Sequence, residues 1–127
     1  MRVLVDTHAL LWYLQADPNL STLAMNTIES KDNDVFVSIA SLWEIAIKLG
    51  LNKLEIQRPF ENLEIDLQQL DIKVLPIAFS DIQVYRSLPL YHRDPFDRIF
   101  IAQSIGNSLT IITRDALFEP YSVELIW

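Results

Sequence analysis

Short runs of β-branched and other apolar residues alternate along this chain with segments of helical spacing, and this alternation constrains the fold more than any other feature. The runs are continuously apolar, which is typical of strands that are covered on both faces. They predict a mostly parallel sheet of about five strands within a three-layer α/β/α sandwich. The expected strands are residues 2–6, 34–39, 72–77, 109–113 and 123–127.

Segments of helical spacing fill the stretches between these runs, at residues 7–15, 20–30, 40–50, 60–70, 80–88 and 94–106. We expect Ser21 or Thr22 to cap the second helix and a serine to cap the fifth. Gly50 and Gly106 are expected to end the third and the sixth. The 127 residues contain no internal repeat or linker, so we expect a single domain that spans residues 1–127.

The composition favours a globular protein of a reducing compartment. Half of the residues are hydrophobic, which argues against disorder. The absence of cysteine excludes disulfides, zinc–thiolate sites and thiol catalysis. The N-terminal run is too short for the core of a signal peptide, and Glu44 and Lys48 interrupt the most apolar region, residues 35–51. We therefore expect a soluble cytoplasmic protein that does not enter a membrane.

The net charge of −7, from 17 acidic and 10 basic residues, at first argues against a nucleic-acid partner. Five of the acids, however, belong to the candidate site described below, and without them 12 acids face 10 bases. Divalent cations could offset part of the charge of these five. Arg93, Arg98 and Arg114 lie beside them in the sequence, where they could offset phosphate charge or form ion pairs. The acidic total therefore does not exclude a phosphate substrate.

Four separate segments bring carboxylates to the carboxyl edge of the expected sheet, where open parallel sheets form their sites. Asp6 ends the first strand, and Asp115 follows the fourth. Asp94 and Asp97 begin the helix that leads into the fourth strand, and a helix antiparallel to its strand starts at that edge. Glu44 lies one to two turns into the helix that leaves the second strand.

Each of these acids also has a purely structural interpretation, as a helix cap, a turn residue or half of an ion pair. Asp94 and Asp97 fit an N-cap and a capping box, while Glu44 is spaced to pair with Ser41 or with Lys48. Five carboxylates at one edge would repel one another, however, so capping alone does not account for them. A divalent cation resolves the repulsion, and oxygen ligands without cysteine favour Mg²⁺ or Mn²⁺ over zinc.

The histidines and tryptophans give weaker signals. For His8 and His92, polar surface roles are favoured over contact with a phosphate group. Trp12, Trp43 and Trp127 are interpreted as core or interface residues rather than as platforms on which nucleic-acid bases stack.

Four motifs follow one another along the chain: VLVDTHALLW, VSIASLWEIAIK, HRDPFDRIFIAQ and TIITRD. Together they resemble a PIN domain, in particular the VapC-like toxin ribonucleases of bacterial type II toxin–antitoxin pairs. The resemblance implies an acidic quartet that binds Mg²⁺ or Mn²⁺ and hydrolyses the phosphodiester bonds of RNA. Matched motif by motif, the quartet falls on Asp6, Glu44, Asp97 and Asp115.

The same resemblance implies accessory residues and partners. Asp94 becomes a capping or accessory residue, and Thr113 and Arg98 are the other accessory candidates. Similar toxins form dimers and are silenced by a small cognate antitoxin that occupies the site. The apolar segments LLWYL, residues 10–14, and LWEIAIKLG, residues 42–50, are candidate surfaces for such partners, or else parts of the core.

One position departs from the pattern of the family. Many relatives continue after TR with an asparagine and place an acid a few residues later, where this chain has Phe118. Asp115 is the natural substitute for that acid, and Glu119 is the alternative. The fourth ligand is therefore the one that the motif defines least.

Two other functions compete with the nuclease interpretation. A receiver-like phosphoacceptor domain also gathers acids at the carboxyl edge of a parallel sheet. The chain, however, has no paired acids after its first strand and no lysine after the fourth or fifth. The second alternative is a metal-binding PIN scaffold without activity.

Overall fold

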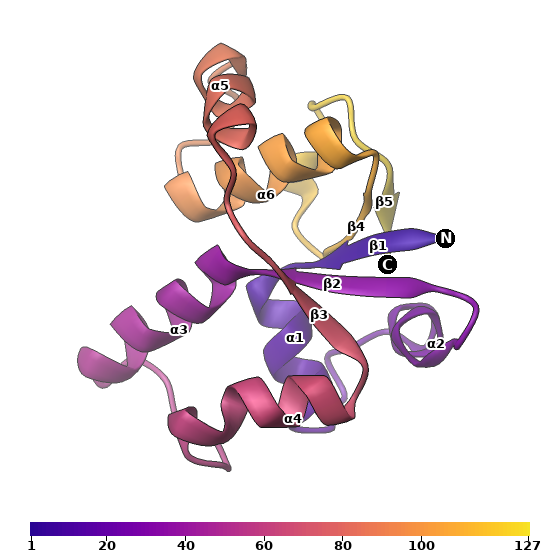
Figure 1. Ribbon diagram of the computed structural model, residues 1–127, viewed down its shortest axis with the longest axis vertical. Helices are drawn as coiled ribbons and strands as arrows, with labels where there is room; N and C mark the ends of the chain where they lie inside the picture. The colour runs from indigo at the N-terminus through magenta and orange to yellow at the C-terminus, as the bar shows by residue number, and fades with distance from the viewer.

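One five-stranded sheet organises the computed structural model, which describes residues 1–127 (Figure 1). The strands are β1 (Arg2–Val5), β2 (Asp34–Ser38), β3 (Ile72–Leu75), β4 (Thr110–Ile112) and β5 (Leu125–Ile126). All neighbours pair in parallel, in the order β3-β2-β1-β4-β5. The chain thus builds outward from β1 to β3 and returns to the other side of β1 with β4. The strand order reverses between β1 and β4, which in open parallel sheets marks the place of a site.

Helices cover both faces of this sheet, which confirms the three-layer α/β/α prediction (Figure 1). The first layer contains α1 (Thr7–Leu14), α2 (Thr22–Glu29), α3 (Ile39–Gly50) and α4 (Leu63–Gln69), and the second contains α5 (Phe79–Ser87) and α6 (Pro95–Asn107). Two short 3₁₀ helices are η1 (Phe60–Asn62) and η2 (Ala116–Phe118). Successive strand side chains alternate between the faces, so Val3 and Val5 pack on the first layer and Leu4 on the second.

Two helix ends differ from the sequence prediction, the start of α5 and the end of α6. The fifth helix has no serine cap, because α5 already begins at Phe79 and places Ser80 inside its first turn. The Asp81 carboxylate accepts a hydrogen bond from the Ala78 backbone N–H at 2.8 Å and fixes this end instead. Ser21 does cap α2, where its hydroxyl accepts from the Ala24 N–H at 3.0 Å.

The helix α3 ends at Gly50, as predicted, whereas α6 continues one residue beyond Gly106. The left-handed residue after each helix is not a glycine: it is Asn52 after α3, with φ 56°, and Ser108 after α6, with φ 55°. Asparagine tolerates this conformation because its short polar side chain can hydrogen-bond locally.

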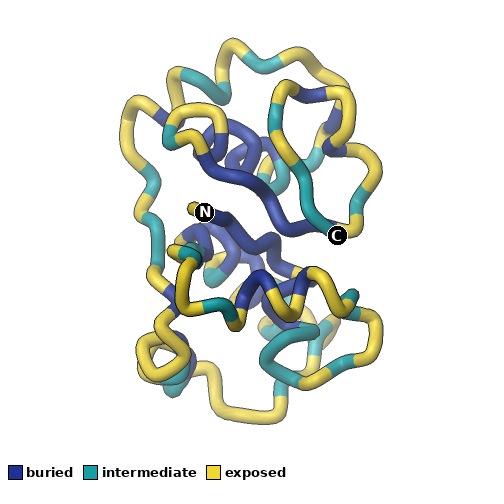
Figure 2. The backbone as a smooth tube through the Cα atoms, turned by 90° about the vertical axis from the view of Figure 1, so that its right-hand side faces the viewer, coloured by how far each residue is buried: buried dark blue, intermediate teal, exposed yellow.

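The buried residues run through the middle of the molecule, and the connecting segments around them are mostly exposed (Figure 2). The strand β1 shows this arrangement most clearly, since only its first residue is exposed. None of the helices is long and apolar enough to cross a membrane.

Candidate metal centre

Asp6 lies directly beyond the carboxyl end of β1, and both of its carboxylate oxygens have partners. Oδ1 accepts a hydrogen bond from the Ala9 backbone N–H at 2.8 Å, which makes Asp6 the N-cap of α1. Oδ2 accepts a hydrogen bond of 2.5 Å from the Thr113 hydroxyl, which comes from the end of β4. The side chain is only 6% exposed. The local capping role and the contact with β4 together hold this carboxylate at the strand-order reversal.

Asp94 and Asp97 have different roles at the start of α6, and only Asp94 caps the helix. Asp94 is the N-cap, since its Oδ1 accepts from the backbone N–H groups of Phe96 at 2.8 Å and of Asp97 at 3.0 Å. Pro95 occupies the first helical position, as the sequence suggested. The Asp97 carboxylate takes no part in capping and receives no hydrogen bond from the backbone. Its oxygens are therefore available to bind a ligand in the site.

Glu44 is buried in α3 with one oxygen paired and the other without a partner. Ser38, rather than Ser41, caps this helix, which places Glu44 in its second turn. Its Oε2 lies 3.1 Å from the Lys48 ammonium group, which is the ion pair expected from the spacing. Its Oε1 is buried and has no hydrogen-bond partner. A buried carboxylate oxygen without a partner is costly, so it indicates a missing ligand.

Asp115 stands beyond the end of β4 and caps the short helix η2. Its Oδ1 accepts from the Leu117 N–H at 2.9 Å, and its own N–H donates to the Thr113 hydroxyl at 3.0 Å. Glu119, the alternative to Asp115, is exposed. Phe118 is completely buried in the core cluster beside α6. Of these candidates for the fourth acid, the structure therefore brings Asp115 to the site.

The carboxylates gathered here change the proton affinity of Asp97. Burial is the largest cause that raises the pKa of Asp97 to about 8. The other causes are the negative charges of four neighbours: Asp94, Glu44, Asp6 and Asp115. The acids that the sequence predicted at one edge of the sheet thus act on one another through space. Without a cation, Asp97 holds its proton at neutral pH.

Asp6 responds to the same surroundings. Burial raises its pKa, and the hydrogen bonds from Thr113 and from the Ala9 N–H oppose this change. The positive charge of His8 also opposes it, and the negative charge of Asp115 reinforces it. Thr113, expected to be accessory, therefore lies in direct contact with the site and favours the ionised form of Asp6.

His92 lies beside the site acids, although its sequence context favoured a polar role at the surface. It is 8% exposed rather than a surface residue. Its Nε2 lies 2.9 Å from Asp97 Oδ2 and 3.5 Å from Asp115 Oδ2. Each of these three side chains has an atom capable of metal binding, and the three atoms lie within 4.8 Å of one another. The only sequence signal for this role was the position of His92 in the HRDPFD motif.

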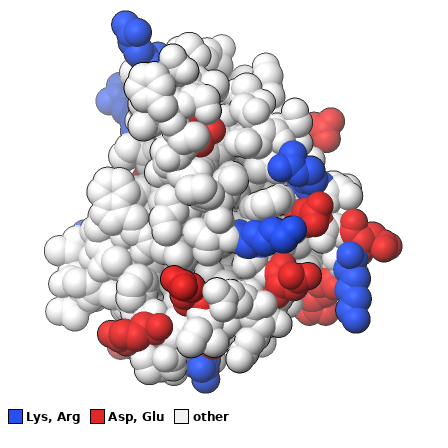
Figure 3. Space-filling model, in the orientation of Figure 1, with Lys and Arg blue, Asp and Glu red and all other residues white.

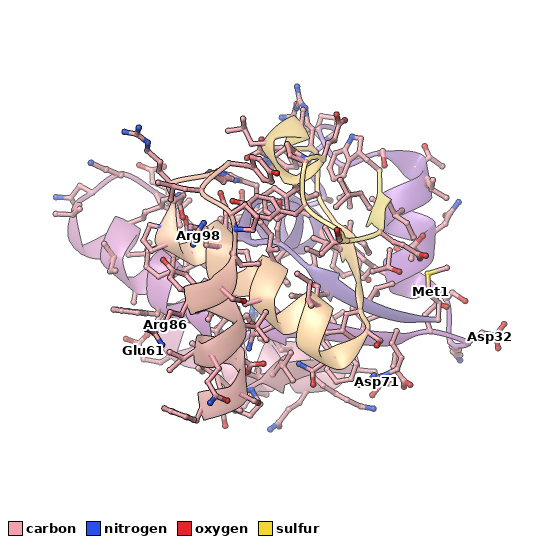
Figure 4. All side chains as sticks on the ribbon, turned by 90° about the horizontal axis from the view of Figure 1, so that it is seen from above. Met1, Asp32, Glu61, Asp71, Arg86 and Arg98 are labelled. Atoms are coloured by element: carbon pink, nitrogen blue, oxygen red, sulfur yellow. The ribbon has the colours of Figure 1, made fainter.

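Arg98 does not have the role that its neighbour Asp97 suggested. Its guanidinium group is buried and donates hydrogen bonds to the backbone carbonyls of Tyr85, Pro89 and His92. In Figure 4 it lies close to the ribbons of α5 and α6. It forms no ion pair with a site acid and is not directed toward a phosphate group. Arg98 is therefore a structural residue, which corrects its assignment as an accessory site residue.

The other two arginines also form no ion pairs with the site acids. Arg93 is exposed, and Arg114 donates to the Asn19 side-chain oxygen at 3.3 Å. The guanidinium group of Arg114 also lies over the ring of Trp12, 5.7 Å from the ring centroid. The negative charge of the carboxylate cluster is thus offset by Lys48 alone among the lysines and arginines.

The donor set fits a hard divalent cation. The charges of Asp6, Glu44 and Asp115, from three other segments, act on the Asp97 carboxylate, and the Glu44 Oε1 atom has no partner. Oxygen donors of this kind are preferred by Mg²⁺ and Mn²⁺. The arrangement can therefore bind such an ion and present it to a phosphate ester.

Comparison with known proteins gives a family match and several structural matches. The family model described as PIN domain matches residues 3–123. VapBC2 from Rickettsia felis, bound to a DNA fragment from its promoter, is similar in structure, with a TM-score of 0.75 and 17% identity over 99% of this chain and 98% of that chain. No curated protein sequence matches this chain.

Two further solved structures are similar. FitAcB from Neisseria gonorrhoeae has a TM-score of 0.66 and 21% identity, over 100% of this chain and 97% of that chain. FitAB bound to an IR36 DNA fragment has the same TM-score and identity, over 99% of this chain and 94% of that chain. At these identities, the likeness concerns the fold.

Proposed function

This chain belongs to the PIN-domain family, and from this membership and its acidic site we propose that it is a metal-dependent ribonuclease, the toxin of a toxin–antitoxin pair. PIN domains are generally nucleases. The observation that carries the proposal is the group of carboxylates around the half-buried Asp97, whose pKa is raised first by burial and then by their charges. Such a group is ionised at neutral pH without strong repulsion only when a cation is bound. The family match gives no support to the receiver-like alternative.

We assign the binding of Mg²⁺ or Mn²⁺ to the side chains of Asp6, Glu44, Asp97 and Asp115. Such a cation, when bound, lowers the pKa of a coordinated water and stabilises negative charge on the phosphate and the leaving oxygen. The Thr113 hydroxyl orients Asp6 for this role through its 2.5 Å hydrogen bond. The Glu44 Oε1 atom, buried and without a partner, is available to complete the shell or to orient the attacking water.

We also propose that the chain forms a homodimer in the cytoplasm and binds a cognate antitoxin. The supporting observation is an apolar stripe on α3, in which Ile39, Trp43 and Ile47 lie four residues apart with exposures of 41%, 62% and 39%. Few charged side chains cover this part of the surface in Figure 3. The segment at residues 10–14, in contrast, packs mainly into the core. Light scattering of the chain, with and without the product of an adjacent small gene, would measure both associations.

Replacement of Asp97 tests the nuclease function. Asp97→Asn should abolish Mn²⁺-dependent cleavage of RNA and relieve any growth arrest on expression, because it removes a charged ligand. Asp94→Asn is the matched control, since asparagine caps a helix as well as aspartate does, and it should cost much less activity. EDTA should stop cleavage by the unaltered protein.

Two results would contradict this function or its assignment. An equal and complete loss in both variants would mean that the third ligand is misassigned. A lack of cleavage by the unaltered protein with any divalent ion, at the level of the EDTA control, would instead favour a metal-binding PIN scaffold without activity.

A further inference from the structure

The hydrogen bonds around His92 define which of its ring nitrogens carries the proton. The Asp94 backbone N–H donates to His92 Nδ1 at 3.2 Å. A nitrogen that accepts a hydrogen bond has its lone pair directed at the donor, so the proton of the neutral ring is on Nε2. Nε2 is therefore a donor in this structure and has no lone pair to offer to a metal ion.

This buried donor faces carboxylates from two different segments. Its contacts are Asp97 Oδ2 at 2.9 Å, from the first turn of α6, and Asp115 Oδ2 at 3.5 Å, from the segment after β4. The N–H group is not aligned as a hydrogen bond to either of them, so a buried polar atom still lacks a partner. Together with the unpartnered Glu44 Oε1 atom, it marks a site whose arrangement is completed by a ligand.

A second network holds the backbone of His92 in place. The His92 N–H donates to the Tyr121 hydroxyl at 2.8 Å, and Tyr121 in turn donates to the Pro89 carbonyl at 2.8 Å. Arg98 donates to the carbonyls of Pro89, at 3.0 Å, and of His92, at 3.4 Å. The ring of His92 also packs edge-on against Phe118, with centroids 5.9 Å apart. These contacts fix the position from which Nε2 points at the two carboxylates.

We propose that His92 is a positioning residue of the metal site, whose Nε2–H group holds the Oδ2 atoms of Asp97 and Asp115 and so orients these two carboxylates, which would bind the cation. This proposal rests on the metal-dependent function proposed above. The Asp97 carboxylate accepts no hydrogen bond from any other residue, and the His92 Nε2 atom lies within 3.5 Å of an oxygen of each acid. Partners that orient metal ligands in this way commonly contribute about 10- to 100-fold to metal affinity or activity.

The test compares two variants that differ in whether a donor remains. In His92→Gln, the amide Nε2 can still donate to the carboxylates, whereas His92→Leu has no donor. His92→Leu also removes the acceptor of the Asp94 N–H, whereas the glutamine oxygen can replace it, so the stability in EDTA separates this structural loss from the loss of the donor. The dissociation constant for Mn²⁺ is measured without RNA, from the free Mn²⁺ signal in electron paramagnetic resonance. The fold is checked by thermal unfolding in EDTA.

We expect His92→Leu to weaken Mn²⁺ binding by about 10- to 100-fold and His92→Gln to restore most of it. Electron spin echo spectroscopy of the unaltered protein with Mn²⁺ should show no directly coordinated imidazole nitrogen. If His92→Leu does not fold, His92→Phe provides a variant without a donor that keeps an edge-on ring beside Phe118.

Three results would overturn the proposal. Equal Mn²⁺ affinity in all variants would mean that His92 has only a packing role. A strong imidazole nitrogen coupling would make it a direct ligand, with the proton moved to Nδ1. Failure of the unaltered protein to bind Mn²⁺ would overturn the metal-dependent function as well, and this result is distinct from the other two.

Discussion

The proton on Asp97 makes the stability of the metal-free protein depend on pH in a specific direction. Burial and four neighbouring carboxylates raise the pKa of Asp97 to about 8 in the folded protein. An aspartate in the unfolded chain titrates near pH ~3.9. Between these two values the folded state binds one proton more than the unfolded state does. The free energy of unfolding must therefore fall as the pH rises through this window, and it must level off above pH 8.

The size of the effect follows from the same two pKa values. One proton of difference corresponds to about 1.4 kcal/mol per pH unit, so the ceiling for Asp97 at pH 7 is about 4 kcal/mol. Asp97→Asn removes the titrating group. In EDTA at pH 7 this variant should be more stable than the unaltered protein, by an amount up to that ceiling. The raised pKa of Asp6 adds a contribution of the same sign, which remains in the variant.

Urea unfolding followed by tryptophan fluorescence, in EDTA and at several values between pH 5 and 8, measures this dependence. The loss of stability across the range should be clearly smaller in Asp97→Asn. Asp34→Asn is the control, because Asp34 is an exposed carboxylate at the opposite end of β2, where it lies 3.4 Å from the Lys73 ammonium group. Equal losses in Asp97→Asn and in the unaltered protein would refute the argument that Asp97 carries the proton.

Two further predictions concern the cation and the buried arginine. Because Asp97 holds a proton below about pH 8, Mn²⁺ binding should release about one proton, and the affinity should rise about tenfold per pH unit between roughly pH 6 and 8. Calorimetry in two buffers of different ionisation enthalpy measures both quantities, and a pH-independent affinity would contradict them. Arg98→Met should lower the free energy of unfolding by about 2–4 kcal/mol, because it leaves buried carbonyl groups without donors. Thermal unfolding checks this loss, and a change within about 0.5 kcal/mol would mean that Arg98 behaves as a surface residue.

The fold and the meeting of the acids could be predicted because both follow from the order of elements along the chain. Continuously apolar strands predict a sheet that is covered on both faces, and parallel strands bring their carboxyl ends to one edge. Asp6 and Asp115 follow strands, and Asp97 begins a helix, so their positions required no knowledge of side-chain packing. The capping of α6 by Asp94 was also predictable, because it depends only on the neighbouring residues of the DPFD motif.

The roles of Arg98 and His92 could not be predicted in this way, because they depend on side-chain direction and on distant partners. Consecutive helical residues point in different directions, so Arg98 faces the carbonyls near α5 while Asp97 faces the site. His92 is held by Tyr121, which lies 29 residues further along the chain. The end of α6 was missed by one residue, since Ser108 takes the left-handed conformation after the helix and Gly106 lies within its last turn.

The hydrogen bond between Asp6 and Thr113 joins residues 107 positions apart, and it determines when the site can exist during synthesis. Asp6 leaves the ribosome well before its partner Thr113, which directly follows β4. The pairing of β1 with β4 must close nearly the whole chain before the carboxylates meet. A nascent or truncated chain that lacks β4 therefore has no assembled acidic cluster. For the ribonuclease proposed above, this connectivity would delay activity until β4 has left the ribosome and paired with β1.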